Sequence, residues 1–222
     1  MKKVLVTWAS DWLWLGFAKL LIDDWIEVVN LSRRKPPIDI YHIETSIDNE
    51  ESINKAVYEI QKQHSQFDAL IHCVGAVSYN PVDQISFQDM AYDLNTNIVW
   101  MTTLTSLLIP LIQENEADIM IVWATLWFKA MSQQAWYTAW TWWKRWVARY
   151  FQLELKDTPC RVISFCPWGM VTKMHEKVTW MKADPKKFMP VEWIAKCMKQ
   201  ILELPKYMEV SEIVINRKVA NI

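Results

Sequence analysis

The sequence predicts a doubly wound α/β fold built on a parallel sheet. Short apolar segments recur along the 222 residues, and segments with helical periodicity separate them. The apolar segments contain almost no polar residues, which is typical of strands that helices cover on both faces. Such alternation is the pattern of a Rossmann fold, and we predict a single domain that covers residues 1–222.

The first unit of the repeat lies at the N-terminal end of the sequence. Residues 3–8 (KVLVTW) are apolar and contain β-branched side chains, which favours a strand. Residues 13–24 (LWLGFAKLLIDD) have helical periodicity, and residues 26–31 (IEVVNL) form a second apolar segment. A strand, a helix and a strand so close together predict a βαβ unit with parallel strands.

The same alternation continues along the rest of the chain. Amphipathic periodicity predicts the helices, and short apolar segments predict the strands. The predicted helices cover about 50–64, 86–113, 136–155 and 190–203, and the predicted strands cover 69–73, 118–124, 162–166 and 212–215.

Composition and charge argue against several kinds of partner. Lys and Arg number 24 against 25 Asp and Glu, so the chain has no basic excess that would hold nucleic acid or an anionic membrane. The longest uncharged stretch, 94–113, contains Asn, Thr and Ser and makes a poor membrane span. The four cysteines and four histidines lack close metal-ligand spacing. We therefore expect a cytoplasmic protein without a metal site.

The glycine and tryptophan contents are abnormal. The chain has 3 Gly and 15 Trp, whereas ordinary usage would give roughly 15 glycines. The two counts together are close to the ordinary share of glycine alone. This suggests that tryptophan stands where glycine is expected.

The segment after the first strand reads TWASDWLW, from Thr7 to Trp14. With glycine in place of its three tryptophans it becomes T-G-x-x-x-G-x-G, and it then resembles the nucleotide-binding turn of the short-chain dehydrogenase/reductase family. Such a turn brings backbone amides and a helix N-terminus against a pyrophosphate, so it requires residues without side chains. The resemblance implies cofactor contacts at Thr7, Trp8, Ser10, Asp11, Trp12, Leu13 and Trp14.

Other tryptophans also stand at glycine positions of this family. Trp25 precedes the second strand, Trp100 completes an N-x-x-G pattern that begins at Asn97, and Trp146 and Trp168 match two more. We interpret the exchange as UGA codons that the organism reads as glycine and that were translated as tryptophan. The alternative is a genuinely Trp-rich chain, in which the phosphate site is blocked and several turns are strained.

The second strand is followed by Arg33 and Arg34, with no acidic residue nearby. Arginine accommodates the 2′-phosphate of NADP, whereas an acidic residue would favour NAD. We therefore predict NADP as cofactor, with NAD as the alternative. The other interpretation is that Arg33 and Arg34 are ordinary surface charges exposed to solvent. The resemblance places further cofactor contacts at Ile47, Cys73, Val74, Gly75, Pro167, Trp168, Met170 and Thr172.

The resemblance also implies catalytic positions. Tyr137 matches the family's tyrosine, the general acid or base at the substrate oxygen, and Asn97 matches the asparagine of its proton relay. The family's lysine, four residues after the tyrosine, is replaced by Thr141. Lys144 lies on the same helical face, about 10 Å from Tyr137. Ala124 aligns with the family's serine, and the neighbouring Thr125 offers a hydroxyl.

The resemblance implies an NADP(H)-dependent oxidoreductase that interconverts a carbonyl and an alcohol on a small molecule by hydride transfer. The alternative is a non-catalytic dinucleotide-binding or regulatory protein of the same fold that has lost the family's lysine and serine. The family resemblance further implies a homodimer or homotetramer that pairs through the helices at 86–113 and 136–155.

The segment 136–151 (WYTAWTWWKRWVARYF) permits another interpretation, because tryptophan interleaved with basic residues occurs in membrane-surface helices and base-stacking platforms. Its tryptophans do not gather on one helical face: Trp140 and Trp143 share a side that Trp142 and Trp146 do not. We therefore expect neither a membrane nor a nucleic acid as partner.

Overall fold

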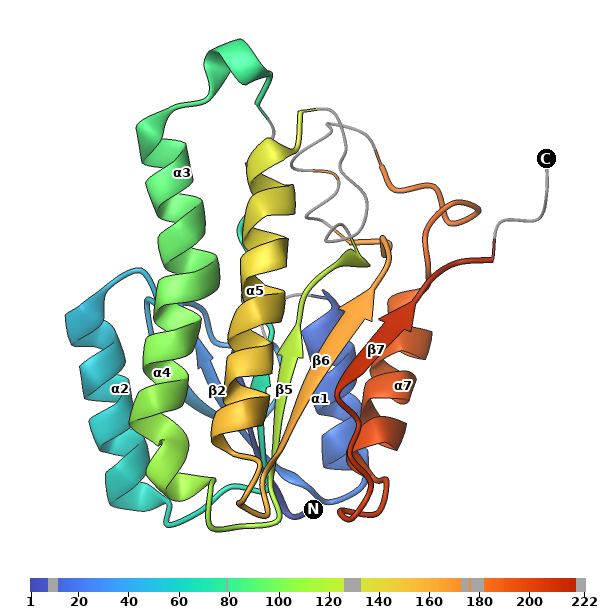
Figure 1. The fold of residues 1–222 in the computed structure, drawn as a ribbon. Helices are drawn as coiled ribbons and strands as arrows, with labels where there is room; N and C mark the ends of the chain where they lie inside the picture. Colours follow the sequence, from blue (N-terminus) through green and yellow to red (C-terminus); the bar gives the residue numbers. More distant parts are fainter. Residues whose placement is uncertain (8–11, 79, 126–132, 173–175, 177–181, 219–222) are drawn as a thin grey trace.

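The computed structural model describes residues 1–7, 12–78, 80–125, 133–172, 176 and 182–218 (Figure 1). Within these residues seven strands form one parallel sheet in the order β3-β2-β1-β4-β5-β6-β7, which confirms the predicted fold class. The strands are β1 (Lys3–Thr7), β2 (Glu27–Ser32), β3 (Tyr41–Glu44), β4 (Ala69–His72), β5 (Asp118–Val122), β6 (Arg161–Pro167) and β7 (Glu212–Ile215).

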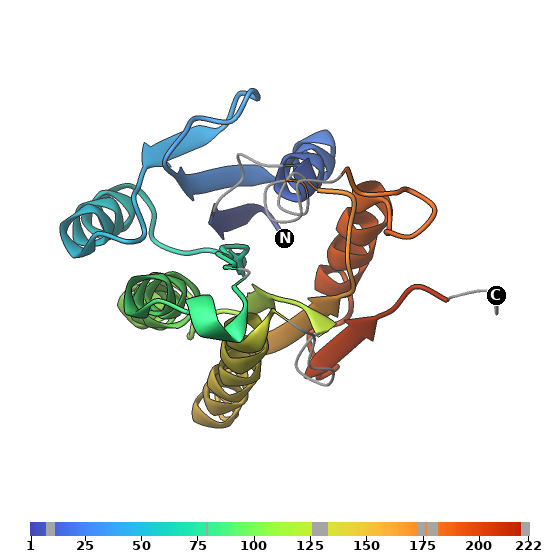
Figure 2. The same cartoon turned by 90° about the horizontal axis from the view of Figure 1, so that it is seen from above.

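Helices cover both faces of the sheet, as Figure 2 shows from above. One face packs against α1 (Trp12–Asp23) and α7 (Val191–Leu202). The other face packs against α2 (Glu50–Gln63), α4 (Trp100–Leu108) and α5 (Ala135–Glu154).

Strand β1 supplies side chains to both of these cores. Val4 and Val6 belong to the cluster beneath α1 and α7, and Leu5 belongs to the opposite cluster. Successive side chains of a strand point to opposite faces, so a strand covered on both sides must be apolar throughout. This explains why the predicted strand segments are nearly free of polar residues.

The predicted long helix over 86–113 is interrupted, and the prediction of one continuous helix is wrong. Helix α3 (Phe87–Leu94) passes through a π turn, η2 (Asn95–Val99), into α4, and the 3₁₀ turn η3 (Ile109–Leu111) follows. In the π turn the amide of Trp100 donates to the carbonyl of Asn95, five residues back. π turns of this kind occur frequently at functional sites.

The edge strand β3 was not predicted. Its sequence YHIE has one buried residue, Ile43, and its other side chains are partly or fully exposed. An edge strand with polar side chains lacks the continuous apolar character of the central strands, so the apolar pattern did not reveal it.

The end of α1 adopts a left-handed cap. Trp25 has φ 61°, its amide donates to the carbonyl of Ile22, and the amide of Ile26 donates to the carbonyl of Leu21. These two bonds form a Schellman motif with Trp25 at the position that glycine usually occupies. The Trp25 side chain is 96% exposed, so burial does not compensate for the backbone strain.

An ion cluster closes the end of the sheet opposite the strand C-termini. The buried carboxylate of Asp118, the first residue of β5, accepts from the guanidinium of Arg161 at 2.7 and 3.0 Å and from Lys206 at 2.5 Å. Arg161 also donates to the carbonyls of Leu204, Pro205 and Met208. The cluster ties the connection between α7 and β7 to the central strands.

No helix among the described residues has the length and apolar character that a membrane span requires.

Candidate functional site

The strand order reverses between β1 and β4. From β1 the chain adds strands in one direction to β3, and from β4 it adds them in the other direction to β7. In doubly wound sheets the crevice at the strand C-termini beside this reversal binds ligands. Thr7 ends β1 at this point, where its hydroxyl accepts from the amide of Cys73 at 3.1 Å and donates to the carbonyl of Ile71 at 3.4 Å.

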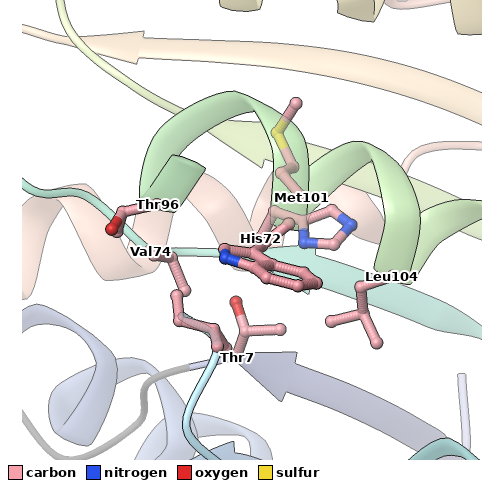
Figure 3. A pocket seen from close by; sticks show the side chains of 8 residues that line it. Thr7, His72, Val74, Thr96, Met101 and Leu104 are labelled. Atoms are coloured by element: carbon pink, nitrogen blue, oxygen red, sulfur yellow. The ribbon is translucent and has the colours of Figure 1, made fainter. Parts of the chain in front are cut away.

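A small hollow lies beside this reversal (Figure 3). Its lining brings together three predicted cofactor positions, Thr7, Ile47 and Val74, with Trp100, where the sequence predicts a family glycine. The other lining residues are His72, Thr96, Met101 and Leu104. Among the described residues, the buried indole nitrogen of Trp100 and the hydroxyl of Thr96 have no hydrogen-bond partner.

His72 lines this hollow with an uncharged side chain. Its Nε2 lies 2.7 Å from the hydroxyl of Thr105, and the side chain is buried. Burial, with a smaller contribution from the charge of Lys144, lowers the pKa of His72 to about 3. The imidazole is therefore uncharged at neutral pH.

Asn97 lies in the π turn η2 and is fully buried. Its Oδ1 accepts from the amide of Ala76 at 3.1 Å, and its Nδ2 donates to the carbonyls of Ala76 at 2.9 Å and Asp93 at 2.8 Å. The side chain therefore joins the helix to the segment that follows β4.

Tyr137 and Lys144 lie two turns apart on α5, and Trp140 contacts both. The Tyr137 and Trp140 rings meet edge to face with centroids 4.8 Å apart, and Nζ of Lys144 lies 5.2 Å from the centroid of Trp140. Thr141, which the sequence predicts at the family's lysine position, is buried, and its hydroxyl donates to the carbonyl of Thr138 at 2.7 Å.

Lys144 is 1% exposed, and its Nζ donates to the carbonyl of Val74 at 2.9 Å. Desolvation lowers the pKa of this ammonium to about 7, while the nearby Cys73 acts in the opposite direction. A buried lysine with a near-neutral pKa at a ligand crevice is a candidate functional group. The sequence indicated only its spacing from Tyr137, not its burial.

The predicted contacts of the first turn are only partly described. Trp8, Ser10, Asp11 and the side chain of Trp12 lie outside the described residues. The side chains of Leu13 and Trp14 belong to the core beneath α1 and α7, so only their backbone can face a ligand.

The remaining predicted cofactor residues lie at the C-terminal ends of three strands. Arg33 and Arg34 follow β2 and are exposed, and the hydroxyl of Ser32 donates to the carbonyl of Arg34 at 2.8 Å. Gly75 follows β4. Pro167 ends β6, Trp168 stacks on Phe188, and Met170 pairs with Met189; Thr172 is half-buried. Thr125, a predicted catalytic position rather than a cofactor contact, is buried and follows β5.

No group of three or more His, Cys, Asp or Glu within the described part of the chain could hold a metal ion.

A sequence model of the short chain dehydrogenase family matches residues 17–183. The chain belongs to this family. No curated protein matches the short-chain dehydrogenase described here. Its fold is similar to an alcohol dehydrogenase from the archaeon Thermococcus sibiricus complexed with 5-hydroxy-NADP, with a TM-score of 0.87 and 15% identity over 99% of this chain and 100% of that one.

Two further dehydrogenases and reductases have the same fold. A 3-ketoacyl-(acyl-carrier-protein) reductase from Brucella melitensis, complexed with NADH, gives a TM-score of 0.84 and 18% identity over 96% of this chain and 95% of that one. The aldohexose dehydrogenase of Thermoplasma acidophilum gives a TM-score of 0.84 and 16% identity over 96% of this chain and 91% of that one.

The lining of the hollow combines apolar surface with one unpartnered hydroxyl. The apolar side chains of Ile47, Val74 and Leu104 suit the faces of a flat base, and the unpartnered hydroxyl of Thr96 offers a hydrogen bond. Trp100 forms part of the same wall, so a smaller residue there would widen the hollow.

Proposed function

We propose that this short-chain dehydrogenase uses NADP(H) to interconvert a carbonyl and an alcohol on a small molecule, with Tyr137 as general acid and base. The observation that carries the proposal is the contact of Lys144 with Val74. It supports the proposal because Lys144 shares one face of α5 with positions 137 and 141 and contacts the segment that follows β4, near the strand C-termini where doubly wound folds bind ligands.

Bound NADP(H) supplies or accepts the hydride. In the reducing direction the Tyr137 hydroxyl donates a proton to the carbonyl oxygen, so that hydride and proton together give the alcohol. The hydroxyl of Thr125 orients the substrate oxygen, and Asn97 belongs to the path that returns a proton to Tyr137. Lys144, rather than the uncharged Thr141, is the residue on this side of α5 that can carry a positive charge, and its pKa of about 7 lets it gain or lose a proton near neutral pH.

The choice of NADP rests on Arg33 and Arg34, which are exposed after β2 where a 2′-phosphate would be held. Replacing both with alanine is expected to raise the Kd for NADPH while leaving that for NADH nearly unchanged. An equal effect on both cofactors would show that the arginines are an ordinary solvated pair.

Activity is tested with purified protein, NADPH and a panel of aldehydes and ketones. Tyr137→Phe is expected to reduce kcat by about 10²-fold or more, with the Kd for NADPH retained. Tyr150→Phe, an exposed change on the same helix, is the matched control. Equal rates for wild type and Tyr137→Phe would remove Tyr137 from the mechanism.

The second candidate function is a dinucleotide-binding protein without turnover. Thr141 favours it, because a buried threonine bonded to its own helix stands in the position of the family's lysine. Binding of NADPH without turnover of any carbonyl in the panel would support this function.

We also propose that the protein is cytoplasmic and pairs as a homodimer or homotetramer through the helical segment 86–113, which includes α3 and α4, and through α5. The exposed apolar side chains of Val99 at the start of α4 and of Tyr150 and Leu153 on α5 support such pairing. Light scattering after size-exclusion chromatography measures the assembly, and a monomer at all concentrations would contradict it.

A further inference from the structure

The segment between β4 and α3 is held on every second residue. The carbonyl of Val74 accepts from Lys144, and Ala76 exchanges two hydrogen bonds with Asn97. Further along, the amide of Ser78 donates to Oδ2 of Asp93 at 3.0 Å. The side chain of Asn80 then donates to Asp89 at 3.0 Å.

The residues of α3 and its π turn that contact this segment are also regularly spaced. Asp89, Asp93 and Asn97 are spaced four residues apart, so they share one face of α3 and its π turn. They meet residues 80, 78 and 76 in that order, so the segment runs antiparallel to the helix. We call these three pairs of side chain and segment residue the clasp.

Asp93 is the unusual member of the clasp. Its side chain is 1% exposed, and burial raises the pKa of its carboxyl while the bonds from Ser78 act in the opposite direction. Its Oδ1 has no partner among the described residues. A carboxylate is costly to bury, so its retention at this position calls for a role beyond filling space.

The alternation determines which backbone groups remain for a ligand. In an extended chain the N–H and C=O groups of successive residues point to opposite sides. Because residues 74, 76 and 78 turn theirs toward the helices, Gly75 and Val77 turn theirs away. Gly75 and Val74 are predicted cofactor positions, and Val74 also lines the hollow.

We propose that Asp93 is a positioning residue that acts through the Ser78 amide. By holding this amide, it keeps residues 74–78 extended along the helix, so that the backbone groups of Gly75 and Val77 face the ligand crevice. The role requires an acceptor oxygen at this point and not a charge. The expected effects of Asp93 on NADPH binding and on turnover rest on the proposed function.

The first test follows amide hydrogen exchange at Ala76 and Ser78 in the protein without cofactor. Both amides are expected to be protected in the wild type. Asp93→Ala is expected to speed exchange at Ser78 by roughly tenfold or more. Asp93→Asn keeps an acceptor oxygen and is expected to retain protection. Asp83→Ala, which changes an exposed carboxylate in η1 (Val82–Gln84), is the control.

The second test measures NADPH binding and turnover. Asp93→Ala is expected to raise the Kd for NADPH by about tenfold, and Asp93→Asn to restore the wild-type value and kcat. Loss in Asp93→Asn as large as in Asp93→Ala would overturn the proposal, because the charge would then act. Unprotected Ser78 in the wild type would also overturn it.

Two outcomes leave amide exchange as the deciding measurement. If Asp93→Ala does not fold, the exchange of the wild type and of Asp93→Asn still decides the proposal. If the wild type neither binds NADPH nor reduces any carbonyl, the proposed function fails, and the clasp is judged on exchange alone.

Discussion

Nζ of Lys144 lies 2.9 Å from the carbonyl oxygen of Val74 and so joins the middle of α5 to the segment that follows β4. The ammonium is buried, and this carbonyl and the face of Trp140 are two of its neighbours. Such an ammonium is poorly compensated for the loss of water, which is why its pKa falls to about 7. The burial of this ammonium therefore makes stability depend on pH.

Lys144→Met is expected to remove a pH-dependent part of the stability. The pKa of Lys144 is about 7 in the folded chain against an ordinary 10.5, so the unfolded chain holds more protons between these values. The free energy of unfolding of the wild type should therefore rise relative to the variant, by about 2 kcal/mol from pH 7 to 9. Urea denaturation at several pH values measures this. Parallel curves would show that the ammonium remains hydrated.

His72→Gln is expected to make the protein less sensitive to acid. Burial holds the pKa of His72 at about 3 in the folded chain, against 6.5 ordinarily. The unfolded chain therefore binds the extra proton as the pH falls through this window, and wild-type stability is lost there. The loss between pH 6 and 4 should exceed that of the variant by about 2 kcal/mol. Thermal unfolding at these pH values compares the two, and an equal loss would contradict a buried neutral imidazole.

Trp25→Gly is expected to raise the free energy of unfolding by about 1 kcal/mol. The substitution removes the Cβ from a residue at φ 61° and exposes no core, because the indole is 96% exposed. Trp146→Gly is the matched control in the middle of α5, where the side chain is 62% exposed. There glycine should lower stability by about 0.5 kcal/mol. The same sign for both changes would refute the strain at Trp25.

Asp118→Asn is expected to cost about 3 kcal/mol or more, because it leaves Arg161 and Lys206 without their shared carboxylate in a buried position. Asp157→Asn, which affects the exposed pair with Lys156, should change stability by less than about 1 kcal/mol. Chemical denaturation measures both. A loss at Asp118 no larger than that at Asp157 would show that the ion cluster contributes little.

Trp100→Gly is expected to widen the hollow and to strengthen NADPH binding, because it removes the indole from a wall shared with Ile47 and Val74. Calorimetry with NADPH measures the Kd, and Trp142→Gly on the exposed face of α5 is the control. Unchanged affinity in Trp100→Gly would place the adenine elsewhere.

The central strands and the order of elements could be predicted because burial on both faces leaves a direct record in the apolar pattern. Strand β3 could not, since an edge strand such as YHIE buries only Ile43. The π turn at Asn95 could not either, because its sequence is compatible with a continuous helix.

The candidate site follows the same division. Spacing within one helix, as from Tyr137 to Lys144, could be read from the sequence. The burial of Lys144 and the bond from Ser78 to Asp93 depend on how α3 and α5 approach the end of β4. The sequence signal for Asp93 is its position four residues before Asn97, on the same helical face.

The left-handed cap at Trp25 has a consequence for decoding. A residue with positive φ is strained when it carries a Cβ, so this turn is more stable with glycine than with any other amino acid. The backbone conformation at residue 25 therefore favours glycine, which is the residue that a glycine-charged tRNA reading UGA would insert. The protein isolated from its own organism is then expected to weigh less than the 26.4 kDa of the chain as written.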